Sequence, residues 1–162
     1  MSRIDETIQA KIEKRRSLEA LGVLAHPYSF DKQHSIAHAR TALDQTVQTA
    51  ARILSLRTHG KLNFLDLQDD SGKIQVMLRE GSLSEDQTAL IPLIDPGDYL
   101  GVAGSVSLSK TGEVTIMATS IQVLSKALRP IPTTWNAAED KEVRFRKRYL
   151  DMMINPATKK VL

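Results

Sequence analysis

The sequence predicts a mainly-β fold with helical appendages, and three observations support this class. Residues 46–125 contain five runs in which apolar and polar residues alternate, as they do in half-buried strands. Short turn signals, among them DDSG, DPGD and KTGE, separate these runs. An amphipathic helical pattern precedes them at residues 4–21.

The composition is that of a water-soluble globular protein. The chain has 162 residues, of which 41% are hydrophobic and 25% charged, and its net charge is +3. The absence of cysteine excludes disulfides, zinc knuckles and thiol nucleophiles. No run approaches the roughly 18 uncharged apolar residues of a membrane span, and the N-terminus is too charged for a signal peptide. We therefore expect no membrane association and a cytoplasmic location.

Residues 1–45 are expected to form an N-terminal helical extension. Apolar residues recur at near-helical spacing from Ile4 to Leu21, and Gly22 follows as a natural stop. The stretch SIAHARTALD, residues 35–44, predicts a short second helix with Ser35 as its N-cap.

The strand order predicts a specific β architecture. The expected strands are residues 47–61, 62–68, 73–79, 99–109 and 113–124, with a helical insertion at about residues 83–93. Five strands with a helix between the third and the fourth match the OB-fold, a five-stranded Greek-key barrel that often binds nucleic acid.

The hairpin NFLDLQDDSGKIQVML, residues 63–78, places an aromatic ring on the polar face of the sheet. If Gln68 pairs with Lys73 across the turn, Phe64 lies opposite Met77, and Gln75 shares its face. A ring that stacks on a base, an amide that reads a base edge and a cation that meets a phosphate are typical of single-strand recognition by an OB sheet. The hairpin therefore predicts a nucleic-acid site.

Two alternatives stay open at this point. Phe64 could be covered by the N-terminal helix or by the insertion, in which case the domain would be structural and would bind no RNA. The domain could also be a freestanding single-strand-binding module with little preference among sequences.

Other candidate sites have weaker support. His34 and His38 are four residues apart, but no third ligand has suitable spacing, so a solvated helix face is favoured and no metal site is predicted. The basic run RFRKRY, residues 144–149, follows three acidic residues within residues 139–142, which favours a charged helix face over a phosphate-binding patch. The chain has neither a GxxxxGK[ST] loop nor a GxSxG elbow, and no catalytic residue is predicted.

Three segments together resemble a known family. RILSLRTHGKLNFLDLQDDSGKIQVML, DPGDYLGVAGSVSLSKTGEVTI and SKALRPIPTTWNAAEDKEVRFRKRYLDMMINP are similar to the N-terminal part of bacterial-type class II lysyl-tRNA synthetases. The ALRP connector followed by RFRKRYLD separates the lysine enzymes from their aspartyl and asparaginyl relatives.

The resemblance implies a division of the chain into three parts. Residues 46–125 would be the OB-fold anticodon-binding domain, and residues 126–162 a hinge and the start of a class II catalytic domain that is otherwise absent. The parent enzyme would activate lysine with ATP and magnesium, transfer it to tRNA(Lys), and form a homodimer. We expect the 162-residue segment to need no cofactor and to be inactive as a ligase by itself.

The resemblance also implies roles for individual residues. The family's aromatic residue on the second strand stacks on the central uridine of the anticodon and its glutamine on the third strand reads the uridine edge, which correspond here to Phe64 and Gln75. Arg57 and Glu113 match the family residues that contact the flanking bases. As phosphate contacts of lower specificity we expect Lys61, Lys73 and Arg79.

Overall fold

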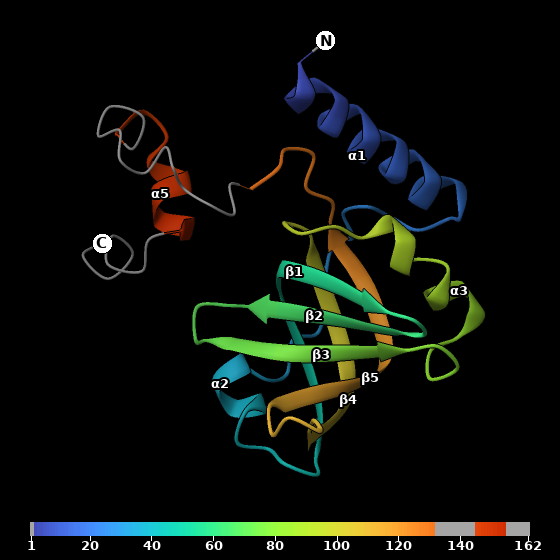
Figure 1. The fold of residues 1–162 in the computed structure, drawn as a ribbon, viewed down its shortest axis with the longest axis vertical. Helices are drawn as coiled ribbons and strands as arrows, with labels where there is room; N and C mark the ends of the chain where they lie inside the picture. The colour runs from blue at the N-terminus through green and yellow to red at the C-terminus, as the bar shows by residue number, and fades with distance from the viewer. Residues whose placement is uncertain (1, 132–144, 155–162) are drawn as a thin grey trace. The chain divides into compact units, whose positions relative to one another are not determined.

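The computed structural model describes residues 2–131 and 145–154, which belong to two compact units, Met1–Pro130 and Ile131–Leu162. The elements of the first unit are α1 (Arg3–Ala20), α2 (Ile36–Ala39), β1 (Thr46–His59), β2 (Leu62–Gln68), β3 (Lys73–Arg79), α3 (Glu85–Thr88), the 3-10 helix η1 (Ile91–Leu93), β4 (Tyr99–Leu108) and β5 (Val114–Ser125) (Figure 1). In the second unit the structure describes α5 (Arg148–Ile154). None of the helices within the described ranges is long and apolar enough to cross a membrane.

The five strands of the first unit close into a barrel in the order β1-β2-β3-β5-β4 (Figure 1). Strands β3 and β5 pair in parallel, and the other neighbours pair antiparallel. The pairing of Gln68 with Lys73 and of Phe64 with Met77 confirms the register predicted for the hairpin. The predicted strand order, with a helix between the third and the fourth strand, is confirmed as well.

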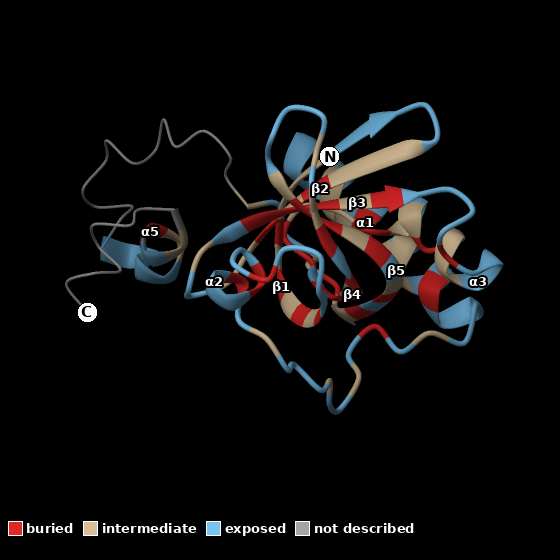
Figure 2. Ribbon diagram, turned by 90° about the horizontal axis from the view of Figure 1, so that it is seen from below, coloured by how far each residue is buried: buried red, intermediate tan, exposed pale blue. Residues whose placement is uncertain are grey.

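One hydrophobic core fills the barrel and continues under two helices. Alternate strand residues such as Ile53, Leu65 and Ile116 have no exposed surface. Leu18 of α1 and Ile36 of α2 are equally buried and belong to the same core, so both helices are attached to the barrel by apolar contacts. Figure 2 shows the buried residues along the strands and the exposed residues in the connecting loops.

Strand β1 pairs with a different neighbouring strand along each half of its length. Residues 46–52 pair with β4, and residues 52–59 pair with β2. The register with β2 shifts between Ile53 and Ser55, so an extra residue bulges out at Leu54. A bulge bends a strand and increases its twist, which lets one strand join both sides of a small barrel.

The helices are shorter than the sequence predicts in two places. The predicted helix at residues 83–93 is split into α3 and η1, because Pro92 has no N–H group and cannot continue an α-helix. The predicted helix at residues 35–44 ends at Ala39, and Asp44 adopts a left-handed conformation, with φ of 60°, before β1. The N-cap predicted at Ser35 is confirmed.

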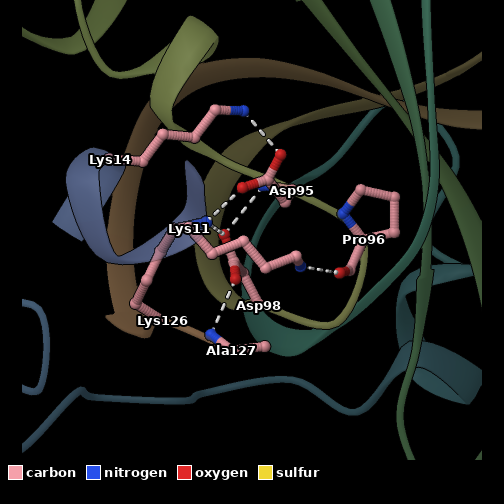
Figure 3. Close-up of polar contacts among 7 residues, drawn as sticks. All are labelled: Lys11, Lys14, Asp95, Pro96, Asp98, Lys126 and Ala127. Carbon is pink, nitrogen blue, oxygen red and sulfur yellow. Dashed lines mark hydrogen bonds and ion pairs between the residues drawn. The ribbon is translucent and has the colours of Figure 1, made fainter. Parts of the chain in front are cut away.

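A buried ion-pair cluster joins the turn before β4 to the chain just after β5 (Figure 3). The Lys126 ammonium lies 2.5 Å from a carboxylate oxygen of Asp95 and 2.7 Å from one of Asp98. The side chains of Lys126 and Asp98 are both 0% exposed. Asp98 also accepts hydrogen bonds from the backbone N–H groups of Asp95 and Ala127, so its charge is well compensated.

Helix α1 is bound to the same cluster. Lys14 pairs with Asp95 at 2.6 Å, and the Lys11 ammonium donates to the carbonyl oxygen of Pro96 at 3.2 Å (Figure 3). Burial opposes the charge on Asp95, but hydrogen bonds from Lys126 and Lys14 outweigh it and lower its pKa. Burial lowers the pKa of Lys11. The cluster therefore fixes α1, the turn before β4 and the exit of β5 to one another.

Asp69 links the β2–β3 turn to the start of α2. Its carboxylate accepts hydrogen bonds from Lys32 Nζ at 2.8 Å, Ile36 N–H at 3.0 Å and Ser71 N–H at 2.8 Å. Burial alone would raise the pKa of Asp69, but these hydrogen bonds hold it well below its ordinary value.

The low pKa of Asp69 predicts a loss of stability in acid. The contribution of the Asp69 carboxylate to the free energy of unfolding is fully present above about pH 3.9, the pKa of an aspartate in the unfolded chain. This contribution is lost as the pH falls through the lower pKa that Asp69 has in the folded protein. In Asp69→Asn, the free energy of unfolding should be lower at neutral pH and should decline less in acid than in the wild type. Urea unfolding of both proteins from neutral pH to about pH 2 measures this, and parallel pH profiles would contradict it.

Candidate nucleic-acid interface

Strand register brings two rows of side chains together on the face that points away from the barrel core. Arg57 is paired with Phe64, and Phe64 with Met77. Across β1, β2, β3 and β5, the first row consists of Arg57, Phe64, Met77 and Met117. The adjacent row consists of Ser55, Asp66, Gln75 and Thr115. The two rows combine a cation, an aromatic ring, apolar surface and hydrogen-bonding groups.

Phe64 is half-buried, so its ring is less exposed than the sequence indicates. The Phe64 ring meets the His59 ring edge-on, with the centroids 6.1 Å apart and the planes at 61°. His59, at the end of β1, was not among the predicted site residues. Part of the Phe64 side chain therefore stays accessible beside a second aromatic ring.

Gln75 is buried, with 8% of its surface accessible, although the sequence predicts it on the solvent-exposed face of the hairpin. Its amide Nε2 donates to Glu113 Oε2 at 3.0 Å, and its Oε1 accepts from the Thr115 hydroxyl at 3.0 Å. Thr115 belongs to β5, which pairs with β3 at Gln75, and Glu113 lies directly before β5. The structure thus joins two predicted site residues, Gln75 and Glu113, and adds Thr115, which sequence reasoning missed.

Arg57 is exposed and pairs with a carboxylate on the neighbouring strand. Its Nη2 lies 3.1 Å from Asp66 Oδ1, and the Ser55 hydroxyl donates to Asp66 Oδ2. The Arg57 side chain is 51% exposed, and an ion pair this open to water contributes only about 0.2–1 kcal/mol. Arg57 can therefore exchange Asp66 for another acceptor at small cost. Asp66 lies two residues after Phe64 and therefore on the same face of β2. Strand alternation in the sequence could thus have predicted that Asp66 belongs to the site.

The predicted phosphate contacts lie at opposite ends of the hairpin and are not brought together. Lys73 is at the β2–β3 turn, whereas Arg79 pairs with Leu62 at the other end, next to Lys61. All three cations are exposed, and the Lys61 ammonium lies 3.7 Å from a carboxylate oxygen of Glu80. Along the hairpin, the two rows of side chains thus have basic residues on either side of them.

His34 and His38 make their contacts with each other and with Gln48, not with the residues of this face. His34 and His38 stack with their ring centroids 5.0 Å apart, and His34 Nδ1 accepts a hydrogen bond from Gln48 N–H. Within the described residues no group of three or more His, Cys, Asp or Glu side chains could hold a metal ion. Of the basic run, residues 145–149 are exposed, while Arg144 and the acidic residues before it lie outside the described residues.

Comparison with known families agrees with the fold. Residues 47–124 match the family of tRNA anticodon domains described as an OB-fold nucleic acid binding domain. Residues 47–124 thus form a five-stranded barrel that is similar to the OB-fold nucleic acid binding domains of this family.

Comparison with curated proteins confirms the resemblance to lysyl-tRNA synthetases. The chain is 36% identical to the lysine–tRNA ligase of Carboxydothermus hydrogenoformans, with 94% of the chain and 32% of the relative covered. It is 39% identical to the lysine–tRNA ligase of Thermosipho africanus, with coverages of 96% and 33%. For that of Thermoanaerobacter pseudethanolicus the identity is 35%, with coverages of 98% and 33%. The chain spans about a third of the length of these relatives.

Proposed function

We propose that the chain is the anticodon-binding portion of a lysine–tRNA ligase and that the two rows on its barrel hold the uridine-rich anticodon loop of tRNA(Lys). The observation that carries this proposal is the register that places Arg57 and Phe64 in one row and Gln75 in the adjacent row, within a barrel similar to OB-fold nucleic acid binding domains. The names of the relatives support lysine and tRNA as the substrates.

Phe64 is the proposed stacking platform for the central uridine. Stacking of a base on an aromatic side chain contributes about 1–3 kcal/mol and requires an accessible ring face. The half-buried Phe64 ring lies opposite Met77, and the next residue in the row is Met117. These methionines supply a polarisable apolar surface beside the ring.

Gln75 is the proposed reader of the uridine edge. An amide has two N–H donors and two acceptor lone pairs, and the contacts with Glu113 and Thr115 occupy one of each. The remaining donor and acceptor complement a base edge that offers one acceptor and one N–H donor. Uracil offers this pair on its Watson–Crick edge, so a single amide suits it.

Arg57 and Glu113 are the proposed contacts to the flanking bases, and Lys61, Lys73 and Arg79 the proposed phosphate contacts. A guanidinium only donates hydrogen bonds and a carboxylate only accepts them. Arg57 therefore requires an acceptor on the base that it contacts, and Glu113 requires a donor. The basic residues at both ends of the hairpin suit a backbone that crosses the face, and their contribution should weaken as salt increases.

The domain organisation is proposed to follow the resemblance. Residues 1–45 form a helical extension, residues 46–125 the anticodon-binding domain, and residues 126–162 a hinge and the start of a class II catalytic domain. In the parent enzyme, proposed to be a cytoplasmic homodimer, anticodon binding would hold the acceptor end of tRNA(Lys) where lysine is activated with ATP and magnesium. This segment would contribute recognition and neither bind a cofactor nor carry out the transfer.

Binding of RNA hairpins tests this proposal. The 162-residue chain is titrated with the anticodon stem-loop of tRNA(Lys) and with a copy in which cytidine replaces the central uridine, at one fixed salt concentration. We expect tighter binding of the uridine loop. Equal binding of both loops would instead support a single-strand-binding module with little sequence preference, and no binding of either would support an assembly domain.

A further inference from the structure

We propose that Thr115 is a positioning residue that holds the Gln75 amide in the orientation which selects uridine over cytidine. The inference rests on the proposed function, because it concerns the residue proposed to read the base edge. It starts from the hydrogen bonds at the two ends of the amide, one to Glu113 and one from Thr115.

The two partners permit only one orientation of the amide. The Glu113 carboxylate accepts hydrogen bonds and cannot donate, so the –NH₂ end of Gln75 must face it. At the other end the Thr115 hydroxyl donates to Gln75 Oε1. An amide turned by 180° would bring its oxygen toward the carboxylate and lose the hydrogen bond to Glu113. The Thr115 hydroxyl would then have to accept from the –NH₂ group instead of donating to Gln75 Oε1.

The single hydroxyl proton of Thr115 has two acceptors within reach. Thr115 Oγ1 lies 3.0 Å from Gln75 Oε1 and 3.0 Å from the backbone oxygen of Glu113. The latter oxygen already accepts from Ser109 N–H at 2.8 Å. Donation to Gln75 satisfies an amide oxygen of a buried residue, so the proton belongs to the Gln75 contact.

Burial makes Thr115 the more rigid of the two partners. Thr115 is 1% exposed, so water cannot take over its hydrogen bond, whereas Glu113 is exposed and its carboxylate can rotate or be hydrated. Fixed polarity matters because uracil and cytosine differ by exchange of donor and acceptor on the Watson–Crick edge. An amide free to turn over would accommodate either base.

A matched pair of substitutions separates this role from simple packing. Thr115→Val removes the hydroxyl at nearly constant volume, and Thr49→Val makes the same change at a threonine that is 0% exposed and whose hydroxyl has no hydrogen-bond partner among the described residues. Thr115→Ser keeps the hydroxyl. The uridine and cytidine hairpins are titrated against all three variants and the wild type at the same salt concentration.

We expect Thr115→Val to reduce the preference for uridine over cytidine about three- to tenfold. Thr115→Ser should retain the wild-type preference, as should Thr49→Val. If Thr115→Val and Thr49→Val keep the same preference as the wild type, the inference is overturned while the proposed function stands. If the wild type itself shows no preference for uridine over cytidine, the proposed function is contradicted, and the inference about Thr115 falls with it. Should Thr115→Val not fold, Thr115→Ala, which places no methyl group against the amide, is measured with the same expectation.

Discussion

Replacing Lys126 with methionine is expected to lower the free energy of unfolding by about 3–5 kcal/mol. The Lys126 ammonium is fully buried and is shared by Asp95 and Asp98. Without it, the buried carboxylate of Asp98 loses the direct ion pair with Lys126, and Asp95 keeps its ion pair with the partly exposed Lys14. An unpaired buried charge costs far more than a surface ion pair contributes, so this should be among the most destabilising single changes in the chain.

Urea unfolding at neutral pH measures the effect, and Lys61→Met is the control. Lys61 also pairs with a carboxylate, that of Glu80, but its side chain is 84% exposed. The control should therefore change stability by at most about 1 kcal/mol. Addition of Asp98→Asn to Lys126→Met should recover part of the loss, because the orphaned charge is removed. Similar losses for Lys126→Met and Lys61→Met would contradict a stabilising role for the buried cluster.

Replacing Phe64 with alanine is expected to weaken binding of the uridine hairpin by about 1–3 kcal/mol, which is roughly 5- to 150-fold in the dissociation constant. The loss arises because the base no longer has a ring to stack on. Phe64 is half-buried and is not part of the barrel core, so the fold should survive the change.

Two further variants show whether the ring or merely its apolar surface is needed. Phe64→Tyr keeps the aromatic ring and should bind nearly as well as the wild type, whereas Phe64→Leu should lose most of the stacking contribution. Each variant is titrated at fixed salt after its unfolding curve has been recorded. Unchanged affinity of Phe64→Ala would show that the ring serves to pack against His59 and not to bind a base.

The local parts of the fold could be predicted from the sequence because they depend on short-range patterns. The alternation in residues 63–78 and the acidic turn between the strands specify the hairpin, and its register placed Phe64 and Gln75 on one face. The stop of α1 before Gly22 follows from the left-handed conformation that glycine adopts there, with φ of 75°. The Pro92 interruption of the insertion also has a local cause and was missed.

The parts that were missed depend on contacts between distant segments. Only the parallel pairing of β3 with β5 brings Thr115 and Glu113 to Gln75, and no local pattern near residue 75 indicates it. For that reason the sequence predicts Gln75 on a solvent-exposed face, whereas in the structure it is buried. The ion pairs of Lys126 are non-local in the same way, since an isolated lysine after a strand has no sequence feature that distinguishes it from a solvated one.

The central claim, that the outer face of the barrel binds the anticodon, is tested most directly by an NMR titration of the 162-residue chain with the uridine hairpin. The signals to follow are the ring protons of Phe64 and the side-chain amide of Gln75. We expect upfield ring shifts for Phe64 as it stacks on a base, a shift of the Gln75 Nε2 signal, and little change at Thr49 inside the barrel. Saturable shifts elsewhere on the chain, with Phe64 and Gln75 unchanged, would contradict the account.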